Sequence, residues 1–346
     1  MTRCSRFARL TAAFAVAATA LALVGCSAGG ESAASSDAAS PANQPVTLML
    51  NWYPYGEHAP FYYGLDKGIF AKHGIDLTIK AGQGSTKTVQ AVGANQVDFG
   101  WADTPALLAN IDKGVKVKSI GVFLQTTPSA VQVFTDSGIK TPSDLKGKTI
   151  AVSAGDAPTT TFPIFLKAVG LDESDVHQQN LDPAGKIAAL ISGRVDGLIG
   201  FVQDQGPTIA NKSGKDMTYL RYSDAGLSFF SNGLIANTDL IASNPGLVKE
   251  MVAATSESFA AAVADPEAAA KSMEGKDPQI QAQSVVLGQW KQTITLLNTP
   301  KTEGKQPGVN DMADWKDTID VLANAGLLTD AGDVEKYFDA SFAPAK

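Results

Sequence analysis

The stretch covering residues 46–76 constrains the fold more than any other part of the chain. An apolar run over 46–50 breaks at the Asn51-Trp52-Tyr53-Pro54 turn and gives way to a helical pattern that ends near Gly68. A second strand pattern then begins at Ile75. The order strand, loop, helix, strand predicts a sheet of the α/β class, with helices packed against it.

The loop after the first predicted strand gathers aromatic and polar side chains. Trp52, Tyr53, Tyr55 and His58 fall within seven residues. Open α/β sheets bind ligands at the carboxyl ends of their strands, and this loop lies at such an end. The pattern therefore predicts a small-molecule site here. The alternative roles are that Trp52 fills space within its lobe and that His58 caps the following helix.

A glycine-rich turn follows the second predicted strand. Gly82 and Gly84 permit tight turning, and Ser85 or Thr86 is expected to cap a helix over 85–94. Such a helix start exposes backbone N–H groups to a ligand. The Lys87-Thr88 pair lacks the spacing of a phosphate-binding P-loop, so no nucleotide site is predicted.

The rest of the chain continues the same alternation of strands and helices. Further strands are expected at 96–101, 117–123, 129–135, 149–153, from 177, at 195–199 and over 227–237, and later helices at 245–264, 266–274, 279–290 and 312–325. Residues 87–98 and 186–196 both predict a helix, a short turn and a strand that opens with Val-Asp. This weak internal repeat predicts two similarly built α/β lobes with a cleft between them.

Polar residues at predicted strand ends, crossovers and helix starts are the candidate ligand contacts. A cleft with aromatic walls and a few directional polar groups suits a flat ligand. The alternative role of each polar side chain is to stabilise a turn or to cap a helix. The candidate binding residues are Asn51, Trp52, Tyr55, His58, Gly84, Ser85, Asp103, Thr104, Gln125, Asp156, Thr159, Gln203, Asp204 and Asn232.

The first 45 residues form a separate segment. Arg3, Arg6 and Arg9 precede an apolar run over 10–24, and Leu23-Val-Gly-Cys26 closes it. This resembles a bacterial lipoprotein signal, which implies cleavage after residue 25 and a lipid on Cys26. Residues 26–45 lack large apolar side chains and predict a flexible tether. The expected location is the extracytoplasmic face of the cell membrane, held by the lipid.

Composition excludes several function classes. Without the three arginines of residues 1–25, the chain has 25 Lys and Arg against 35 Asp and Glu, which argues against nucleic acid as a partner. After Cys26 there is no cysteine, and three unclustered histidines make a poor metal site, so neither a metal nor a cofactor is expected. The chain has neither a His-Glu-x-x-His nor a Gly-x-Ser-x-Gly motif, so the sequence does not predict a hydrolase.

Two motifs resemble those of the solute-binding proteins of the thiamine-pyrimidine-precursor, sulfonate and nitrate type. They are Leu-x-Trp-x-Pro-x-x-x-His at residues 50–58 and Thr-Pro-x-Asp-Leu-x-Gly-Lys at 141–148. The resemblance covers about residues 46–260. It implies the type II periplasmic-binding-protein fold, in which two α/β lobes are joined by two crossover hinge segments. The implied division is lobe I at 46–130 and 235–346, and lobe II at 131–234, with hinges near 128–133 and 230–235.

The same resemblance implies a protein that captures a small heterocycle, foremost a thiamine pyrimidine precursor of the hydroxymethylpyrimidine or formylaminopyrimidine type, and delivers it to the permease and ATPase of an ABC importer. A monomer that is not an enzyme is expected. The alternative ligand is a sulfonate, taurine or nitrate, but no arginine lies between Arg9 and Arg194 to clamp an anion in the first lobe. Related precursor binders carry a glutamate before a proline in the second lobe, where this chain has Asp204 at a shifted position.

The family also includes a fungal enzyme that builds the thiamine pyrimidine from pyridoxal phosphate. The lysine and histidine of that enzyme align with Ala102 and Ala106 of this chain, and its cysteine-rich iron motif has no counterpart here. Neither a Schiff base nor an imidazole donor is available at those positions. The enzymatic alternative is therefore ranked below both binding alternatives.

Overall fold

The computed structural model describes residues 43–329 and 331–344. The predicted signal peptide, the lipid on Cys26 and most of the predicted tether lie outside these residues. Within the described residues, no helix combines the length and the apolar character that crossing a bilayer requires.

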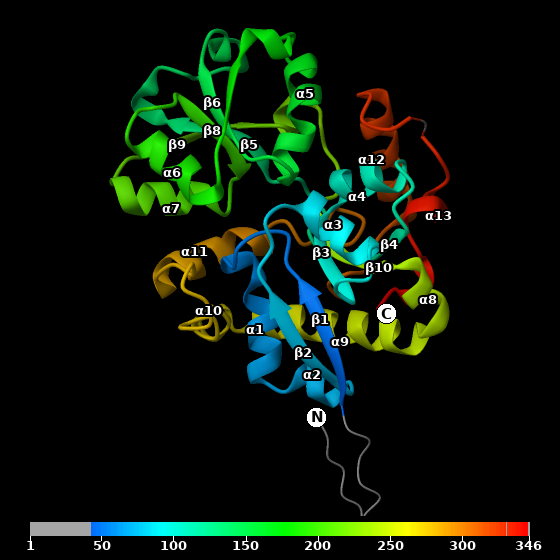
Figure 1. Cartoon of the computed structure of the whole chain (residues 1–346). Helices are drawn as coiled ribbons and strands as arrows, with labels where there is room; N and C mark the ends of the chain where they lie inside the picture. Colours follow the sequence, from blue (N-terminus) through cyan, green and yellow to red (C-terminus); the bar gives the residue numbers. More distant parts are fainter. Residues whose placement is uncertain (1–42, 330, 345–346) are drawn as a thin grey trace, which may run out of the picture. The chain divides into compact units, whose positions relative to one another are not determined.

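Two mixed sheets of five strands organise the chain from residue 43 onward (Figure 1). The first sheet has the strand order β2-β1-β3-β10-β4. Its strands are β1 (Gln44–Met49), β2 (Ile75–Lys80), β3 (Phe99–Asp103), β4 (Val117–Val122) and β10 (Asn232–Asn237). The second sheet has the order β7-β6-β8-β5-β9. Its strands are β5 (Ser129–Phe134), β6 (Thr149–Val152), β7 (His177–Asn180), β8 (Gly197–Phe201) and β9 (Met217–Arg221).

The two sheets repeat one plan, as the internal repeat of the sequence predicts. In each sheet three parallel strands are followed by one antiparallel strand, β10 in the first and β5 in the second. The repeated Val-Asp pair has a structural role, because Asp98 accepts a hydrogen bond from the backbone N–H of Thr47 at 2.7 Å and Asp196 accepts one from Thr149 at 2.8 Å. Each aspartate thereby ties its segment to the neighbouring parallel strand. Each aspartate makes this side-chain bond one residue ahead of the first residue that pairs in the strand ladder. Strands β3 and β8 therefore start at 99 and 197, and not at 96 and 195 as predicted.

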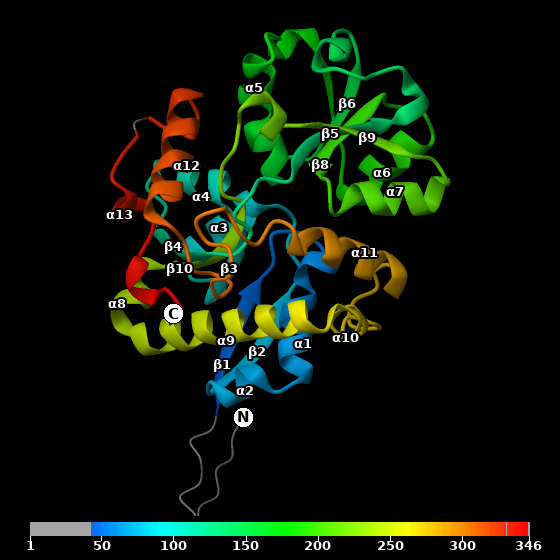
Figure 2. The same ribbon diagram turned by 180° about the vertical axis from the view of Figure 1, so that it is seen from behind.

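Helices cover both faces of the first sheet (Figure 2). The helices of this lobe are η1 (Gly56–His58), α1 (Ala59–Asp66), α2 (Ile69–Lys72), α3 (Ser85–Gly93), α4 (Thr104–Ile111), α8 (Thr238–Ser243), α9 (Pro245–Ala264), α10 (Pro266–Lys271), α11 (Gln283–Ile294), α12 (Met312–Asn324), α13 (Val334–Tyr337) and η6 (Ala340–Phe342). Helix α9 starts where Asn244 accepts from the Leu247 N–H and Pro245 occupies the first turn, where a missing N–H costs nothing. Its apolar face packs against α1, and Phe259 meets Trp101 and Phe61 of the core.

Three long helices cover the second sheet. They are α5 (Ala157–Ala168), α6 (Pro183–Ile191) and α7 (Gln205–Ser213), with the short 3-10 turns η2 (Thr135–Ser137), η3 (Pro142–Leu145), η4 (Glu173–Asp175) and η5 (Ser223–Ala225). One apolar cluster includes residues of both lobes, among them Leu108 of α4 and Ile164 of α5, and these two helices are in contact. On the other side, α11 contacts both η1 and α7. Both lobes are therefore joined by side-chain packing as well as by the chain itself.

The chain passes between the sheets over 123–128 and again over 222–231. The hinge segments expected near 128–133 and 230–235 overlap β5 and β10, because ladder pairing already begins at Ser129 and Asn232. The predicted hinges therefore lie a few residues too late in the chain. The predicted α/β class and the two-lobe plan agree with the observed sheets.

Candidate functional site

A small cavity lies where the two lobes meet, beside the aromatic loop. Its volume is about 20 Å³, enough for about one water molecule. The lining residues come from both lobes: Asn51, Trp52, Tyr55, Ser85, Asp156, Ala157, Pro158, Gly200, Phe201, Asp204 and Gln205. A ring-sized ligand fits here only if the lobes separate and close again around it, as hinged binding proteins do.

Glu57 is the buried centre of the first-lobe wall. Its carboxylate, with no exposed surface, accepts hydrogen bonds from Trp101 Nε1 at 2.6 Å, Asn232 Nδ2 at 2.5 Å, Gln203 Nε2 at 2.9 Å and the Tyr55 hydroxyl. Burial raises the pKa of Glu57, and the four donors oppose that shift. Since Gln203 belongs to the second lobe, this network also crosses the cleft.

These bonds decide which way round the buried amides face. A carboxylate only accepts, so Gln203 and Asn232 must turn their NH₂ groups towards Glu57 and their oxygens away from it. Gln203 Oε1 and Asn232 Oδ1 are buried and have no partner among the described residues. By the same logic Gln205, whose NH₂ donates to Asp204, leaves Oε1 unpartnered, and Gln205 lines the cavity.

Asp204 links the lobes at the opposite wall. The Tyr53 hydroxyl donates to Asp204 Oδ1 at 3.0 Å, and Gln289 Nε2 of α11 donates to the backbone oxygen of Asp204 at 3.2 Å. Gln289 Oε1 in turn accepts from the Gly56 N–H at 2.9 Å. Burial raises the pKa of Asp204 to about 7. The aromatic loop, α11 and the start of α7 are thus held together by one polar network.

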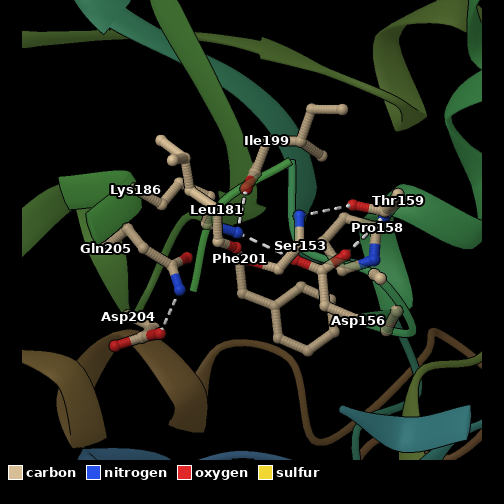
Figure 3. A network of polar contacts seen from close by, with 12 residues as sticks. Ser153, Asp156, Pro158, Thr159, Leu181, Lys186, Ile199, Phe201, Asp204 and Gln205 are labelled. Atoms are coloured by element: carbon tan, nitrogen blue, oxygen red, sulfur yellow. Dashed lines mark hydrogen bonds and ion pairs between the residues drawn. The ribbon is translucent and has the colours of Figure 1, made fainter. Parts of the chain in front are cut away.

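Lys186 is the buried cation of the site (Figure 3). Its Nζ donates to Asp156 Oδ2 at 2.8 Å and to the Ile199 backbone oxygen at 2.7 Å, and it lies 5.4 Å from the centre of the Trp52 ring. Asp156 also accepts from the Thr159 N–H at 2.9 Å, which caps α5. The ion pair therefore fixes the start of α5, while the cation lies against the tryptophan that lines the cavity.

His58 supports the aromatic loop from behind the cavity lining. Its Nδ1 accepts from the Tyr55 N–H at 3.3 Å, so the proton lies on Nε2, which donates to Asn51 Oδ1 at 2.8 Å. Burial lowers the pKa of His58 to about 3, so the ring is neutral and its 4.0 Å approach to Glu57 is not an ion pair. Both ring nitrogens are used within the loop, and direct ligand contact at His58 stays a prediction.

The glycine-rich turn brings the lobes together through backbone atoms. Gly84, at φ 123°, precedes α3, and a Cβ there would lie 2.5 Å from the Gly155 oxygen of the second lobe. The Thr86 N–H donates to that oxygen at 3.2 Å. The expected side-chain cap from Ser85 or Thr86 is absent at this helix start, because Ser85 Oγ instead accepts from the Asp103 N–H at 3.1 Å.

Of the predicted binding residues, the structure brings six to the cavity lining. They are Asn51, Trp52, Tyr55, Ser85, Asp156 and Asp204. Another group is hydrogen-bonded to these lining residues or to Glu57 behind them: His58, Gly84, Asp103, Thr159, Gln203 and Asn232.

Thr104 and Gln125 lie apart from the cavity lining. Thr104 Oγ1 donates to the Ser231 backbone oxygen at 2.7 Å, which ties α4 to the second crossing. Gln125 donates to the Val309 oxygen at 3.0 Å and accepts from Thr302 Oγ1 at 2.9 Å. Their polar groups hold connecting segments in this structure, and direct ligand contact at these two residues stays a prediction.

Three important residues were missing from the sequence-based set: Glu57, Lys186 and Gln205. A helical period could have indicated Lys186, because it shares a face with Ala189 and Leu190, both buried, three and four positions later. Glu57 stands as one charge among aromatic residues, a weak signal on its own. No sequence pattern indicates that Gln205 faces the loop of the other lobe.

The surroundings of the cavity are rich in carboxyl groups. Glu57, Asp103, Asp156 and Asp204 are all buried there. Within 43–329 and 331–344, Lys186 is the one buried cation, and it is paired with Asp156. Burial raises the pKa of Asp103 to about 8. No arginine lines the cavity, in agreement with the arginine-free first-lobe loops of the sequence.

Residues 56–269 match the model of the family described as NMT1/THI5 like. The chain belongs to this family. Among curated relatives, it is similar to the riboflavin-binding protein RibY of Chloroflexus aurantiacus, with 25% identity over 312 residues that cover 88% of each chain. It is also similar to a formylaminopyrimidine-binding protein of Halalkalibacterium halodurans, with 22% identity over 59% of this chain and 62% of the relative.

One relative is an enzyme. The 4-amino-5-hydroxymethyl-2-methylpyrimidine phosphate synthase of Legionella pneumophila is 27% identical over 68% of this chain and 74% of its own length. Among solved structures, the alkanesulfonate-binding protein SsuA of Xanthomonas axonopodis superposes with a TM-score of 0.65 at 14% identity, covering 87% of this chain and 99% of SsuA. At that identity the likeness shows the fold alone, and it confirms the predicted periplasmic-binding-protein fold.

Proposed function

We propose that this family member is the solute-binding component of an ABC importer, held at the extracytoplasmic face by a lipid on Cys26. Its ligand is a small amino-substituted heterocycle, foremost a thiamine pyrimidine precursor, which it delivers unaltered to the permease and ATPase. The names of the formylaminopyrimidine-binding and riboflavin-binding relatives support a nitrogen heterocycle.

The observation that carries this proposal is a pair of unpartnered polar atoms at one cavity. Trp52 Nε1 is a buried donor and Gln205 Oε1 a buried acceptor, and neither has a partner among the described residues. A buried polar group without a partner costs about 1–3 kcal/mol, so a bound ligand that supplies both partners gains affinity. An aminopyrimidine has an edge of this kind, since its ring nitrogen accepts and its amino group donates.

The charges favour this ligand over the anionic alternative. A sulfonate or nitrate brings only acceptors and a negative charge, and the buried residues beside this cavity offer it no unpaired cation, because Lys186 is already paired with Asp156. The usual bidentate arginine is absent from the lining. The solved sulfonate-binding neighbours therefore support the fold of this protein more than its ligand.

The enzymatic alternative has little support from the site residues. Ala102 in β3 and Ala106 in α4, which the resemblance aligns with the enzyme's lysine and histidine, are both buried and carry no reactive group. Lys186 is buried near the cavity, but its ammonium group is engaged by Asp156 and the Ile199 oxygen. Binding without turnover is the proposal that these residues support.

The test measures thermal unfolding and calorimetric affinity of the mature protein with hydroxymethylpyrimidine, formylaminopyrimidine, taurine, an alkanesulfonate and nitrate. A ligand at 100 times its Kd stabilises by about 2.7 kcal/mol, which is readily visible. We expect stabilisation by the pyrimidines alone. Stabilisation by taurine, the alkanesulfonate or nitrate alone would replace this ligand assignment by the anionic one, and consumption of a bound pyrimidine would refute the non-enzymatic proposal.

A pair of tryptophan variants tests the contact itself. Trp52→Phe keeps an aromatic ring and removes the N–H, so pyrimidine affinity should fall about threefold to tenfold through the lost hydrogen bond. Trp315→Phe is the matched control, because Trp315 Nε1 is also buried and unpartnered but lies in α12, packed on Phe230 and Phe338. Equal affinities of both variants and the wild type would remove Trp52 Nε1 from the site.

A further inference from the structure

A second hollow adjoins the cavity. A groove of about 400 Å³ lies between the lobes, and Trp52 lines both the groove and the cavity. The first lobe contributes the turn after β2 and Lys87 of α3, and the second lobe contributes the ends of β6 and β7 with the start of α6. Because Trp52 lines both hollows, a substituent on a ring bound at Trp52 could extend into this groove.

The sizes of the two hollows are very different. The cavity holds about one water molecule, whereas the groove lies within the range of about 300–1,000 Å³ that is typical of small-molecule sites. A bare pyrimidine would leave the groove unused. The groove therefore indicates a ligand with a second part beyond its ring.

The polar groups of the groove suit an uncharged second part. Gln83, Asn180 and Gln279 carry amides, and Ser153 carries a hydroxyl. Ser153 Oγ donates to the Leu181 oxygen at 2.8 Å and Asn180 Oδ1 accepts from the Ala154 N–H at 2.9 Å, which leaves the hydroxyl oxygen to accept and the Asn180 NH₂ group to donate. A hydroxyl-bearing chain matches such groups because each hydroxyl also donates and accepts, whereas a phosphate dianion only accepts.

The charges of the groove lead to the same conclusion. It has one cation, Lys87, and one anion, Asp182, and both have local partners. Lys87 Nζ donates to Gln83 Oε1 at 3.2 Å, and Asp182 accepts from the Gly185 N–H at 2.8 Å. With these charges balanced and no arginine in the lining, a phosphate would gain little here.

We propose that this groove is a second subsite that holds an uncharged, hydroxyl-bearing side chain of the ligand, attached to the ring bound at Trp52. The inference rests on the proposed function, because it requires a heterocycle at the cavity. It extends the proposed ligand class from pyrimidine precursors to heterocycles that carry a polyol or sugar substituent without phosphate.

Two matched series of compounds test the subsite by calorimetry on the mature protein. The first is cytosine, cytidine and cytidine monophosphate, and the second is lumiflavin, riboflavin and flavin mononucleotide. Each series offers a ring, the ring with an uncharged hydroxyl-bearing chain, and the same chain with a phosphate. In at least one series we expect the middle compound to bind at least tenfold tighter than the other two.

Groove variants then locate the effect. In a Gln83→Ala/Gln279→Ala double variant, the advantage of the chain-bearing compound should fall at least fivefold, while affinity for the bare ring changes less than twofold. Gln279 is exposed, and its side chain makes no hydrogen bond to another described residue, so the fold should tolerate its loss. Gln178→Ala is the matched control, since Gln178 is an exposed glutamine of β7 that does not line the groove.

The possible failures are distinguishable. Binding of rings and formylaminopyrimidine with no gain from a chain in either series would overturn the subsite and leave the proposed function standing. A gain that survives in the double variant would also overturn the subsite. If neither the rings nor formylaminopyrimidine bind, both proposals are wrong.

Discussion

The two lobes bury charge beside the cavity in different ways. In the first lobe Glu57 has no cation partner and is surrounded by four neutral donors. In the second lobe Asp156 is paired with Lys186, and both side chains are at most 5% exposed. The carboxyl group of Glu57 is therefore stabilised by dipoles alone, whereas that of Asp156 is stabilised by a buried cation.

The difference indicates how the site selects its ligand. A carboxylate that is satisfied by dipoles alone still repels anions, because hydrogen bonds stabilise its charge without neutralising it. The Lys186 pair orders α5 and places a cation against Trp52 without offering it to a ligand, since its carboxylate partner is already in contact. Three predictions test this contrast, from the largest expected effect to the smallest.

Replacing the unpaired charge should have the largest effect. Glu57→Leu leaves four buried donors without an acceptor, and at about 1–3 kcal/mol for each the free energy of unfolding should fall by more than about 4 kcal/mol. Chemical denaturation measures the change. Glu57→Gln serves as the comparison, because its carbonyl still accepts from part of the set, and its loss should be smaller. Equal losses in the two variants would show that the carboxyl group is not the centre of the network.

Breaking the paired charge should cost somewhat less and should be recoverable. Lys186→Met leaves Asp156 buried without its cation, which typically costs about 3–5 kcal/mol of folding free energy. Adding Asp156→Asn removes the stranded charge and keeps an oxygen to cap α5, so the double variant should regain part of the loss in the same denaturation experiment. A double variant that is less stable than Lys186→Met would show that the pair does not act as a unit.

The third effect is a pH dependence of stability from the acidic wall, which is small for each pH unit. Burial raises the pKa of Asp103 to about 8 from 3.8, so the folded chain holds a proton there that the unfolded chain releases. Stability from this group is therefore present at low pH and is lost as pH rises through about 4 to 8, with a slope of at most about 1.4 kcal/mol per pH unit. In melts between about pH 5 and about pH 8, wild type should lose stability relative to Asp103→Asn as pH increases. Parallel curves would show that Asp103 does not titrate in this window.

Local patterns accounted for most of the fold. Residues 46–80 contain a clear strand, turn, helix and strand pattern, and α9 carries both a Pro start and an Asn cap, so these elements formed where they were expected. The repeated Val-Asp phrase indicated two lobes because each copy performs the same local task with Thr47 or Thr149. Strand starts and crossings were displaced by a few residues, because where a ladder begins depends on the partner strand.

The site was predicted less completely. Trp52 and Tyr55 were identified because aromatic residues crowd a loop at the end of a strand, where side chains are free to face a cleft. Gln125 looked equivalent at another strand end, but it faces Thr302 and Val309, which the chain brings close from about 180 residues later. Whether a loop amide meets the cleft or a distant segment depends on packing that a local pattern does not contain.

By itself, the sequence determined the alternation of strands and helices, the doubling of that plan, and an aromatic, arginine-free first-lobe loop. These follow from periodicity and composition, which act over a few neighbouring residues. Only the tertiary structure decided that donors from both lobes surround Glu57, that Lys186 forms an ion pair with Asp156, and that Gln205 lines the cavity. Each of those outcomes depends on burial and on partners far apart in the chain, and burial is what makes an unpaired charge or a free amide oxygen costly enough to matter.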